Sequence, residues 1–367
     1  MKTKNLYLAA LMLGFISWSC TKSDNLNAPG ANQGTLKTSI NNGVTELTSA
    51  MNNITSSAGY QVLSGPSDLT TKSLVLSPLD TVTHSILLSD IAGVYDYKAK
   101  TITKGHRSFL SFFTKTAANS QMIVKLPEQK VVNSRTLLRY TASDTLLAND
   151  YVITLSDYQY RFKYFNGYTY QLASSINVKN VDAGLLKVTT SNNQTSGYHF
   201  ASEFDFPSGY VTKMQYSSGD TATSVYSILK GAKTLYEEKY TAIRTSASSW
   251  HREKSFSLTI GNVLIERSLI PGQSSLDSAK VYVGGVLQLH SKVEIVDTTV
   301  TDPVDNSITS KRRELKITFD DGTSQTFTQL AGAVIDNIYA LFTSMRQVTF
   351  ATGIVDWIAW DVYNGKL

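Results

Sequence analysis

Aromatic side chains at every second position of residues 158–170 form the clearest pattern in this chain that could bind a ligand. Alternate residues of a strand point to the same face, so two such runs would gather their rings on one side of a sheet. Rings and hydroxyls on one face can stack against a ligand and hydrogen-bond to it, although packing within a sheet would use the same pattern. The candidate ligand-binding residues are Tyr158, Tyr160, Phe162, Tyr164, Tyr168 and Tyr170.

A hairpin must hold these two runs together, and Asn166-Gly167 marks its turn. A two-residue turn at this pair would put the two apolar sets on opposite faces of the sheet. A bulged three-residue loop keeps them on one face, because a slip of one residue moves every side chain across the sheet. We therefore predict the bulged loop, which pairs Phe162 with Tyr170 and Tyr160 with Leu172.

Paired carboxylates could do acid–base chemistry, and Glu203 and Asp205 lie two residues apart on one predicted strand. Glycoside hydrolysis needs two such groups, and burial could raise the pKa of one of them. Phe204 and Phe206 alternate with them and supply the apolar face, so we predict that the carboxylates point outward into solvent. The sequence predicts no catalytic residue and favours a non-enzymatic protein.

The sequence gives little support for a metal-binding or nucleotide-binding site. The 5 histidines lie far apart and the chain has 1 cysteine, which leaves a structural zinc site few ligands. The sequence has no phosphate-binding glycine loop and no serine hydrolase elbow. Asp320-Asp321-Gly322 has the opening of a calcium loop without its spaced ligands, so we predict a hairpin turn there. We expect no metal site and no cofactor.

Composition and charge exclude nucleic acid as a partner. The formal net charge of +5 is spread along the chain, and the longest basic run is Lys311-Arg312-Arg313. Nucleic-acid-binding domains gather their Lys and Arg residues in patches. The 42% of hydrophobic and 17% of charged residues are typical of a folded, secreted protein.

The first nineteen residues have the layout of a secretory signal. Lys2 and Lys4 precede the apolar run 6–16, which is too short to span a bilayer. Ser17 and Ser19 are small residues ahead of Cys20 and suit a peptidase that cleaves before the cysteine. This segment resembles the lipobox of bacterial lipoprotein signal peptides, although Leu is usual where Ser17 stands. An ordinary secretory signal with a coincidental cysteine is the alternative.

The lipobox resemblance implies that Cys20 carries acyl chains and that this lipid holds the protein on a membrane. In such lipoproteins an Asp after the cysteine signals retention in the inner membrane. Thr21 stands there instead, so we expect the outer membrane, on either its periplasmic or its surface side. Residues 20–34 are polar and predict a flexible tether that reaches about 20 Å.

Hydrophobic periodicity predicts an α+β fold, with twisted antiparallel sheets and helices packed on them. Helices are expected over 35–56, 221–246 and 330–348, and the apolar residues near 357–360 are expected to pack against the body. The length favours two lobes, 35–250 and 251–367, or one large domain. Strands are expected at 94–102, 121–126, 184–190, 198–206, 210–216, 255–260, 263–269, 286–296, 315–319 and 325–328.

The predicted element order resembles the half-barrel lipid-carrier lipoproteins, whose helices line the concave face of a curved sheet. We expect a lipid-anchored envelope protein that binds a ligand or a protein partner without catalysis. A lipid carrier with an apolar cavity is one alternative. A surface glycan-binding protein, or an accessory to a glycoside hydrolase, is another, and it predicts exposed and coplanar aromatic rings.

Overall fold

The computed structural model describes residues 35–64, 83–98, 112–132, 147–163, 166–244, 252–269, 279–301, 309–346 and 349–365. Cys20, the predicted signal segment, the whole of the predicted tether and Tyr164 lie outside these ranges. The chain divides into two compact units, which are described separately. Unit 1 comprises Met1–Met51 and Asp220–Ile338, and unit 2 comprises Asn52–Gly219 and Tyr339–Leu367.

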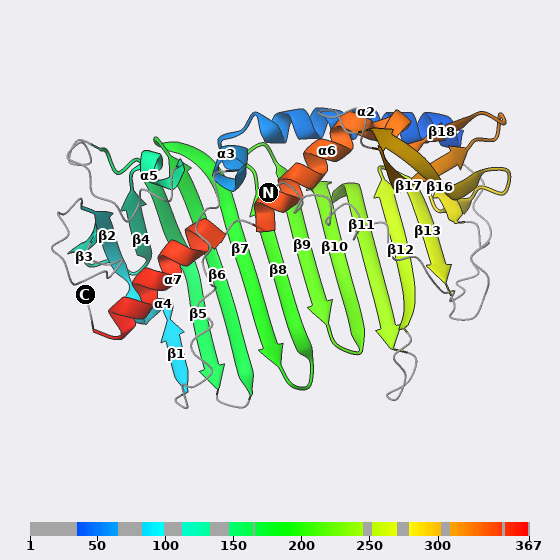
Figure 1. The fold of residues 1–367 in the computed structure, drawn as a ribbon. Coiled ribbons are helices and arrows are strands. Elements are labelled where there is room, and N and C mark those ends of the chain that lie inside the picture. The colour runs from blue at the N-terminus through cyan, green and yellow to red at the C-terminus, as the bar shows by residue number, and fades with distance from the viewer. Residues whose placement is uncertain are drawn as a thin grey trace. The chain divides into compact units, whose positions relative to one another are not determined.

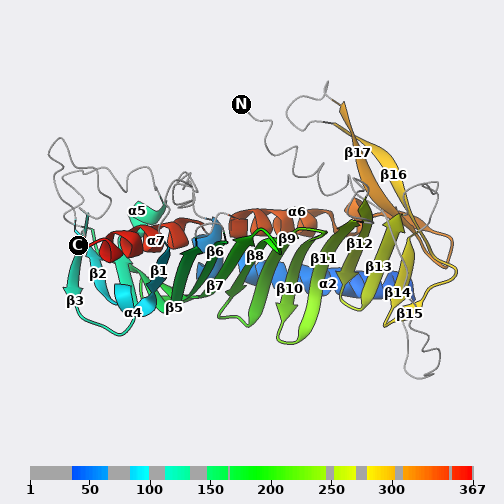
Figure 2. The ribbon, with the colours of Figure 1, turned by 90° about the horizontal axis from the view of Figure 1, so that it is seen from below.

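Unit 2 contains an open, mixed sheet whose strands follow the order β3-β2-β4-β5-β6-β7-β8-β9 (Figure 1). β2 and β4 run parallel, the other neighbours in this order are antiparallel, and β1 pairs with β5. Figures 1 and 2 show helix α7 lying over one face of this sheet, where it contacts β1 and α4. The elements are α3 (Ala58–Ser64), β1 (His84–Leu87), α4 (Leu88–Ile91), β2 (Gly93–Tyr97), β3 (Phe113–Ala117), β4 (Met122–Leu126), α5 (Glu128–Val132), β5 (Tyr151–Lys163), β6 (Gly167–Val178), β7 (Val181–Asn193), β8 (Gly197–Asp205), β9 (Tyr210–Ser218) and α7 (Thr349–Tyr363).

The long strands of unit 2 bury one face and leave the other partly exposed, as the alternation in the sequence predicts. A bulge at Ser156 keeps β5 on this pattern. Before the bulge, Leu155 and the alternate residues that precede it face the core, and after it Tyr158 does. Without the extra residue the second half of β5 would turn its aromatic side chains to the opposite face.

Unit 1 contains a run of antiparallel strands from β10 to β15 and a separate small sheet in the order β16-β17-β18. Helix α2 approaches β12 closely at Gly43, where an added Cβ would lie 3.0 Å from the backbone oxygen of Ile260. The elements are α2 (Leu36–Thr55), β10 (Thr221–Lys230), β11 (Lys233–Arg244), β12 (Arg252–Ile260), β13 (Val263–Leu269), β14 (Lys280–Val283), β15 (Val286–Leu287), β16 (Lys292–Thr301), β17 (Thr309–Thr318), β18 (Ser324–Thr326) and α6 (Phe327–Arg346), with α2 and α6 running on into unit 2.

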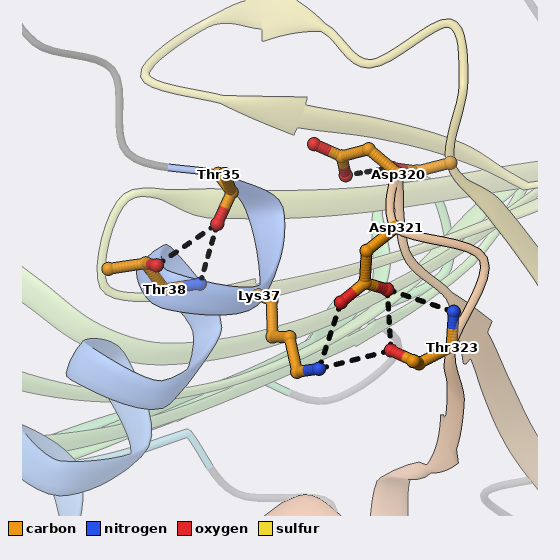
Figure 3. A network of polar contacts seen from close by, with 7 residues as sticks. Thr35, Lys37, Thr38, Asp320, Asp321 and Thr323 are labelled. Carbon is orange, nitrogen blue, oxygen red and sulfur yellow. Dashed lines mark hydrogen bonds and ion pairs between the residues drawn. The ribbon is translucent and has the colours of Figure 1, made fainter.

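A polar network ties the start of α2 to the turn between β17 and β18 (Figure 3). The hydroxyl of Thr35 accepts a hydrogen bond from the backbone of Thr38 and caps the helix. Lys37 Nζ donates to Asp321 Oδ2 at 3.0 Å and to Thr323 Oγ1 at 3.1 Å. Hydrogen bonds from Thr323, followed by the one from Lys37, lower the pKa of Asp321 to about 2. The predicted turn at Asp320-Asp321-Gly322 is confirmed.

The β-rich architecture with helices is confirmed, and α2 and α6 fall near the predicted spans 35–56 and 330–348. The prediction of purely antiparallel sheets is wrong, because β2 and β4 run parallel. The helix predicted over 221–246 is wrong, because that segment forms the hairpin of β10 and β11. Gly231 takes a φ of 57° at the turn, a conformation that ends a helix and suits a hairpin. The Thr and Tyr residues on either side favour strands. The C-terminal apolar residues form helix α7, and Ile358 is fully buried, as expected of a packed segment.

Strands β5 and β6 pair in a different register from the predicted one. Phe162 pairs with Tyr168 and Tyr160 pairs with Tyr170, a shift of two residues from the predicted pairs. A shift of two residues preserves the face of every side chain. The predicted grouping on one face is therefore right for the described members, and the predicted partners are wrong.

None of the helices in the described part of the chain combines the length and hydropathy that a membrane crossing requires.

Gly59 of α3 and Gly332 of α6 provide a matched pair for testing the packing. A Cβ at Gly59 would lie 2.4 Å from the Ala183 oxygen and 2.9 Å from the Phe204 and Phe206 rings, whereas a Cβ at Gly332 would meet its nearest atom, in Thr328, at 3.6 Å. We expect Gly59→Ala to destabilise the protein by about 1–3 kcal/mol. Gly332→Ala should stabilise it by about 0.5–1 kcal/mol through helix propensity.

Urea unfolding followed by circular dichroism measures both variants. An unfolding midpoint for Gly59→Ala equal to or above that of the wild type would contradict the close packing of α3 on β7.

Candidate functional site

Two rows of aromatic side chains cross strands β5 to β9 of unit 2 on the face that α7 partly covers. Residues directly opposite each other in an antiparallel pair share a face, so the pairing places each row. One row runs through Tyr160, Tyr170, Thr190, Phe200 and Tyr216. The next row runs through Phe162, Tyr168, Asn192, Tyr198 and Ser218. We call the aromatic members of both rows the aromatic face: Tyr160, Phe162, Tyr168, Tyr170, Tyr198, Phe200 and Tyr216.

The aromatic face is reachable by solvent. Six of its side chains are half-buried and Tyr216 is 45% exposed. The next row inward, which includes Tyr158 and Leu172, is buried. Burial decreases in this direction toward the β5–β6 hairpin, so these rings form a partly open surface beside α7.

The rings of the aromatic face are tilted against one another. Tyr198 and Tyr216 have centroids 5.9 Å apart and planes at 49°, and Tyr170 meets the buried Tyr158 edge-on at 89°. The expectation of coplanar rings is therefore wrong for these pairs. The hydroxyls take part as well, because Tyr198 hydrogen-bonds with the side chain of Thr190, and burial followed by the nearby Tyr198 raises the pKa of Tyr168. The surface mixes ring edges, ring faces and hydroxyls.

A second aromatic cluster adjoins this face at the end of α7. His84 of β1 pairs with Phe162 of β5. Its ring meets Trp360 edge-on at a centroid distance of 5.4 Å and Tyr363 at 6.2 Å. Trp360 and Tyr363 are themselves roughly parallel, at 6.3 Å. The C-terminal turn of α7 thus extends the aromatic surface beyond β5.

A buried carboxyl group joins α7 to the strands beneath it. The Asp356 carboxyl accepts hydrogen bonds at 3.1 Å from the hydroxyls of both Tyr158 and Tyr170, on Oδ1 in each case. Ile354, Val355 and Ile358 of the same helix are fully buried apolar side chains. Tyr170 therefore belongs both to the aromatic face and to a polar contact beneath helix α7.

Burial dominates the electrostatics of this contact. Asp356 as a whole residue keeps some exposed surface, but its carboxyl group lies away from water, and burial raises its pKa to about 7 against the two hydrogen bonds that lower it. Burial, followed by the charge of Asp356, raises the pKa of Tyr158 and of Tyr170 well above the ordinary value of 10.0. The tyrosines are therefore neutral donors, and Asp356 is the group that changes charge near neutral pH.

The carboxylates Glu203 and Asp205 lie on the opposite face of the sheet, as predicted. Lys187 Nζ reaches Glu203 Oε1 at 2.6 Å and Asp205 Oδ2 at 3.1 Å, and Lys213 Nζ reaches Glu203 Oε2 at 2.6 Å. Burial raises the pKa of Glu203, but hydrogen bonds from the two lysines outweigh it and lower the pKa overall. A carboxylate held ionised in this way cannot serve as the proton donor of a hydrolase near neutral pH.

The structure brings together the described members of the predicted ligand-binding set. Tyr160, Phe162, Tyr168 and Tyr170 lie on the aromatic face, and Tyr158 lies beneath α7. Sequence reasoning missed Tyr198 and Phe200, although they continue the alternation that ends in Phe204. It also missed Asp356, whose signal was a single carboxylate inside the apolar segment Gly353–Trp360.

Within the described ranges, no three His, Cys, Asp or Glu side chains gather in a way that could hold a metal ion. Comparison with family models, with curated proteins and with solved structures finds no match for this chain.

Tyr170→Phe tests the polar contact beneath α7. The variant keeps the ring and removes one of the two donors to a buried carboxyl, so we expect the free energy of unfolding to fall by about 1–3 kcal/mol at pH 8. Tyr282→Phe removes a hydroxyl from a half-buried strand position in unit 1 and is the matched control, with an expected change within about 0.5 kcal/mol. Equal effects of the two variants in urea unfolding would show that the Asp356 contact adds no stability.

Proposed function

We propose that this chain is a lipid-anchored protein of the bacterial envelope whose unit 2 binds a glycan on the aromatic face without catalysis. The observation that carries the proposal is the gathering of seven partly accessible aromatic side chains on one face of the β5–β9 sheet, with Thr190 and Asn192 between them.

The chemistry of this face suits a sugar. A pyranose ring has faces of C–H groups that pack on aromatic rings, and its rim of hydroxyls exchanges hydrogen bonds with tyrosine, threonine and asparagine side chains. Tyr side chains also offer large contact areas at a low cost in side-chain entropy. The tilt of the measured pairs differs from the coplanar platform expected from the sequence, so we propose contacts to ring edges and hydroxyls as well as to ring faces.

The envelope location rests on the lipobox resemblance around Cys20. Acyl chains on that cysteine would be the only anchor that this proposal requires. A tether of residues 20–34 with a reach of about 20 Å would leave the folded body in the aqueous phase beside the membrane. There it would meet polysaccharides of the envelope or its surroundings.

A glycan array with the soluble body of the protein, from residue 21 onward, tests the ligand class. We expect binding to one family of glycans, and we expect Tyr198→Ala or Tyr168→Ala to weaken it by about tenfold, a loss in the range of about 1–3 kcal/mol that removal of an aromatic stacking partner costs for a nucleic-acid base. Tyr282→Ala is the control and should bind as the wild type does.

Two outcomes of this experiment would replace the proposal. If no glycan binds but organic extraction of the purified protein releases phospholipid or fatty acid, the alternative of a half-barrel lipid carrier gains support. If glycans bind equally to the wild type and to both aromatic-face variants, the site lies elsewhere on the chain.

Cys20→Ala tests the anchor separately. We expect the wild type to incorporate an alkyne-labelled fatty acid and to fractionate with the outer membrane. The Cys20→Ala variant should lose the label and leave the membrane fraction, because no acyl chain can form on it. Ser19→Ala keeps a small residue before the cleavage point and should behave as the wild type. A Cys20→Ala protein that stays in the membrane fraction would refute lipid anchoring.

A further inference from the structure

Asp356 forms a polar contact between the aromatic face and helix α7. Its carboxyl accepts hydrogen bonds from Tyr158 of β5 and Tyr170 of β6. The Tyr158 ring meets the Tyr170 ring edge-on at 5.9 Å. The orientation of the Tyr170 ring is thus fixed from two sides, by a neighbouring ring and by a carboxyl above it.

The surroundings of Asp356 are apolar or uncharged. On its own helix it lies next to Val355, which is buried, and β5 and β6 contribute tyrosines, including Tyr160. Helix α4 and strand β1 also contact α7, and each carries a titratable group. Asp90 of α4 accepts a hydrogen bond from the backbone of Leu87, and the ring of His84 in β1 faces Trp360 and Tyr363. Those groups are therefore engaged elsewhere, and the two tyrosine hydroxyls are the donors to Asp356.

We infer that Asp356 is a positioning residue for the aromatic face: its carboxyl holds Tyr170 beneath α7, and its ionisation makes the opening of α7 away from β5 and β6 easier, because only the opened state returns the charge to water. An ionised carboxylate in this site keeps only two neutral donors against the loss of its hydration. The inference deepens the proposed function, because it names the group that would make binding depend on pH, but the contact itself exists whether or not the ligand is a glycan.

The direction of the pH effect follows from the raised pKa of Asp356, which is about 7 in the folded protein against an ordinary value of 3.8. Between these two values the folded state holds a proton that the unfolded state has released. Stability from this site is therefore fully present below about pH 3.8 and is lost as the pH rises to about 7. Above that value α7 closes over a buried charge, so the free energy of opening α7 is lowest there.

Hydrogen exchange of the α7 amides, together with hydroxyl-radical footprinting of Tyr170, tests the inference on the soluble body of the wild-type protein. The readouts are the exchange protection factor of residues 354–359, corrected for the intrinsic effect of pH, and the oxidation rate of Tyr170 relative to Tyr282. Between pH 5.5 and pH 8.5 we expect protection of α7 to fall at least about tenfold and oxidation of Tyr170 to rise, with both changes levelling off above the pKa of Asp356.

Asp356→Asn is the decisive variant, because it keeps a side-chain oxygen as acceptor and cannot ionise. Its protection factors and Tyr170 oxidation should stay constant over the same pH range. Asp336→Asn removes an exposed carboxylate from α6 and should follow the wild type. If Asp356 had a purely structural role, Asp356→Asn would change the free energy of unfolding, but the oxidation of Tyr170 would not depend on pH in the wild type.

Protection of α7 in the wild type that stays constant from pH 5.5 to pH 8.5 would overturn the inference, as would a pH dependence that persists in Asp356→Asn. Neither result depends on a glycan, so failure here is distinguishable from failure of the proposed function. If no glycan binds on the array but the exchange protection of α7 still depends on pH, the glycan proposal is contradicted and the positioning role of Asp356 is supported.

Discussion

One carboxyl group, buried between a helix and two strands, is the contact on which the arrangement of the aromatic face depends. A buried carboxyl is costly unless its oxygens find donors, and Tyr158 and Tyr170 provide them at Asp356. Those hydroxyls converge only if β5 and β6 pair with Tyr160 opposite Tyr170, which leaves Tyr158 one row inward on the neighbouring strand. The contact with Asp356 therefore requires both this register of the hairpin and this position of α7.

The two faces of the same sheet serve different purposes. On one face Lys187, Glu203, Asp205 and Lys213 form ion pairs in contact with water, which contribute solubility and little stability. On the other face apolar side chains form the core, and beyond the edge of that core the row pattern continues as tyrosine and phenylalanine. A surface that is aromatic, partly hydroxylated and open to solvent is suited to a ligand with both apolar and polar faces. This combination is why a glycan is favoured over a purely apolar ligand.

The sequence predicted the features that local patterns determine. Alternation placed the tyrosines of β5 and β6 on one face, and periodicity located α2 and α6. It failed over 221–246, where Val225, Leu229 and Ala232 have helical spacing but Gly231 takes a turn conformation and the flanking residues pair across a hairpin. Pairing across strands is a tertiary effect, and a single strand does not reveal its partner. For the same reason the face of Tyr170 could be predicted, but not its partner across the hairpin or its contact with Asp356, which lies 186 residues away.

A carbon-13 NMR titration of the Asp356 carboxyl, assigned by comparison with Asp356→Asn, tests this account most directly. The account predicts that the carboxyl carbon titrates near pH 7, with the ring signals of Tyr170 shifting along the same curve, because burial against neutral donors favours the protonated form. A titration near pH 4, with Tyr170 unaffected, would mean that Asp356 is exposed to water and that α7 does not close over β5 and β6 in this way.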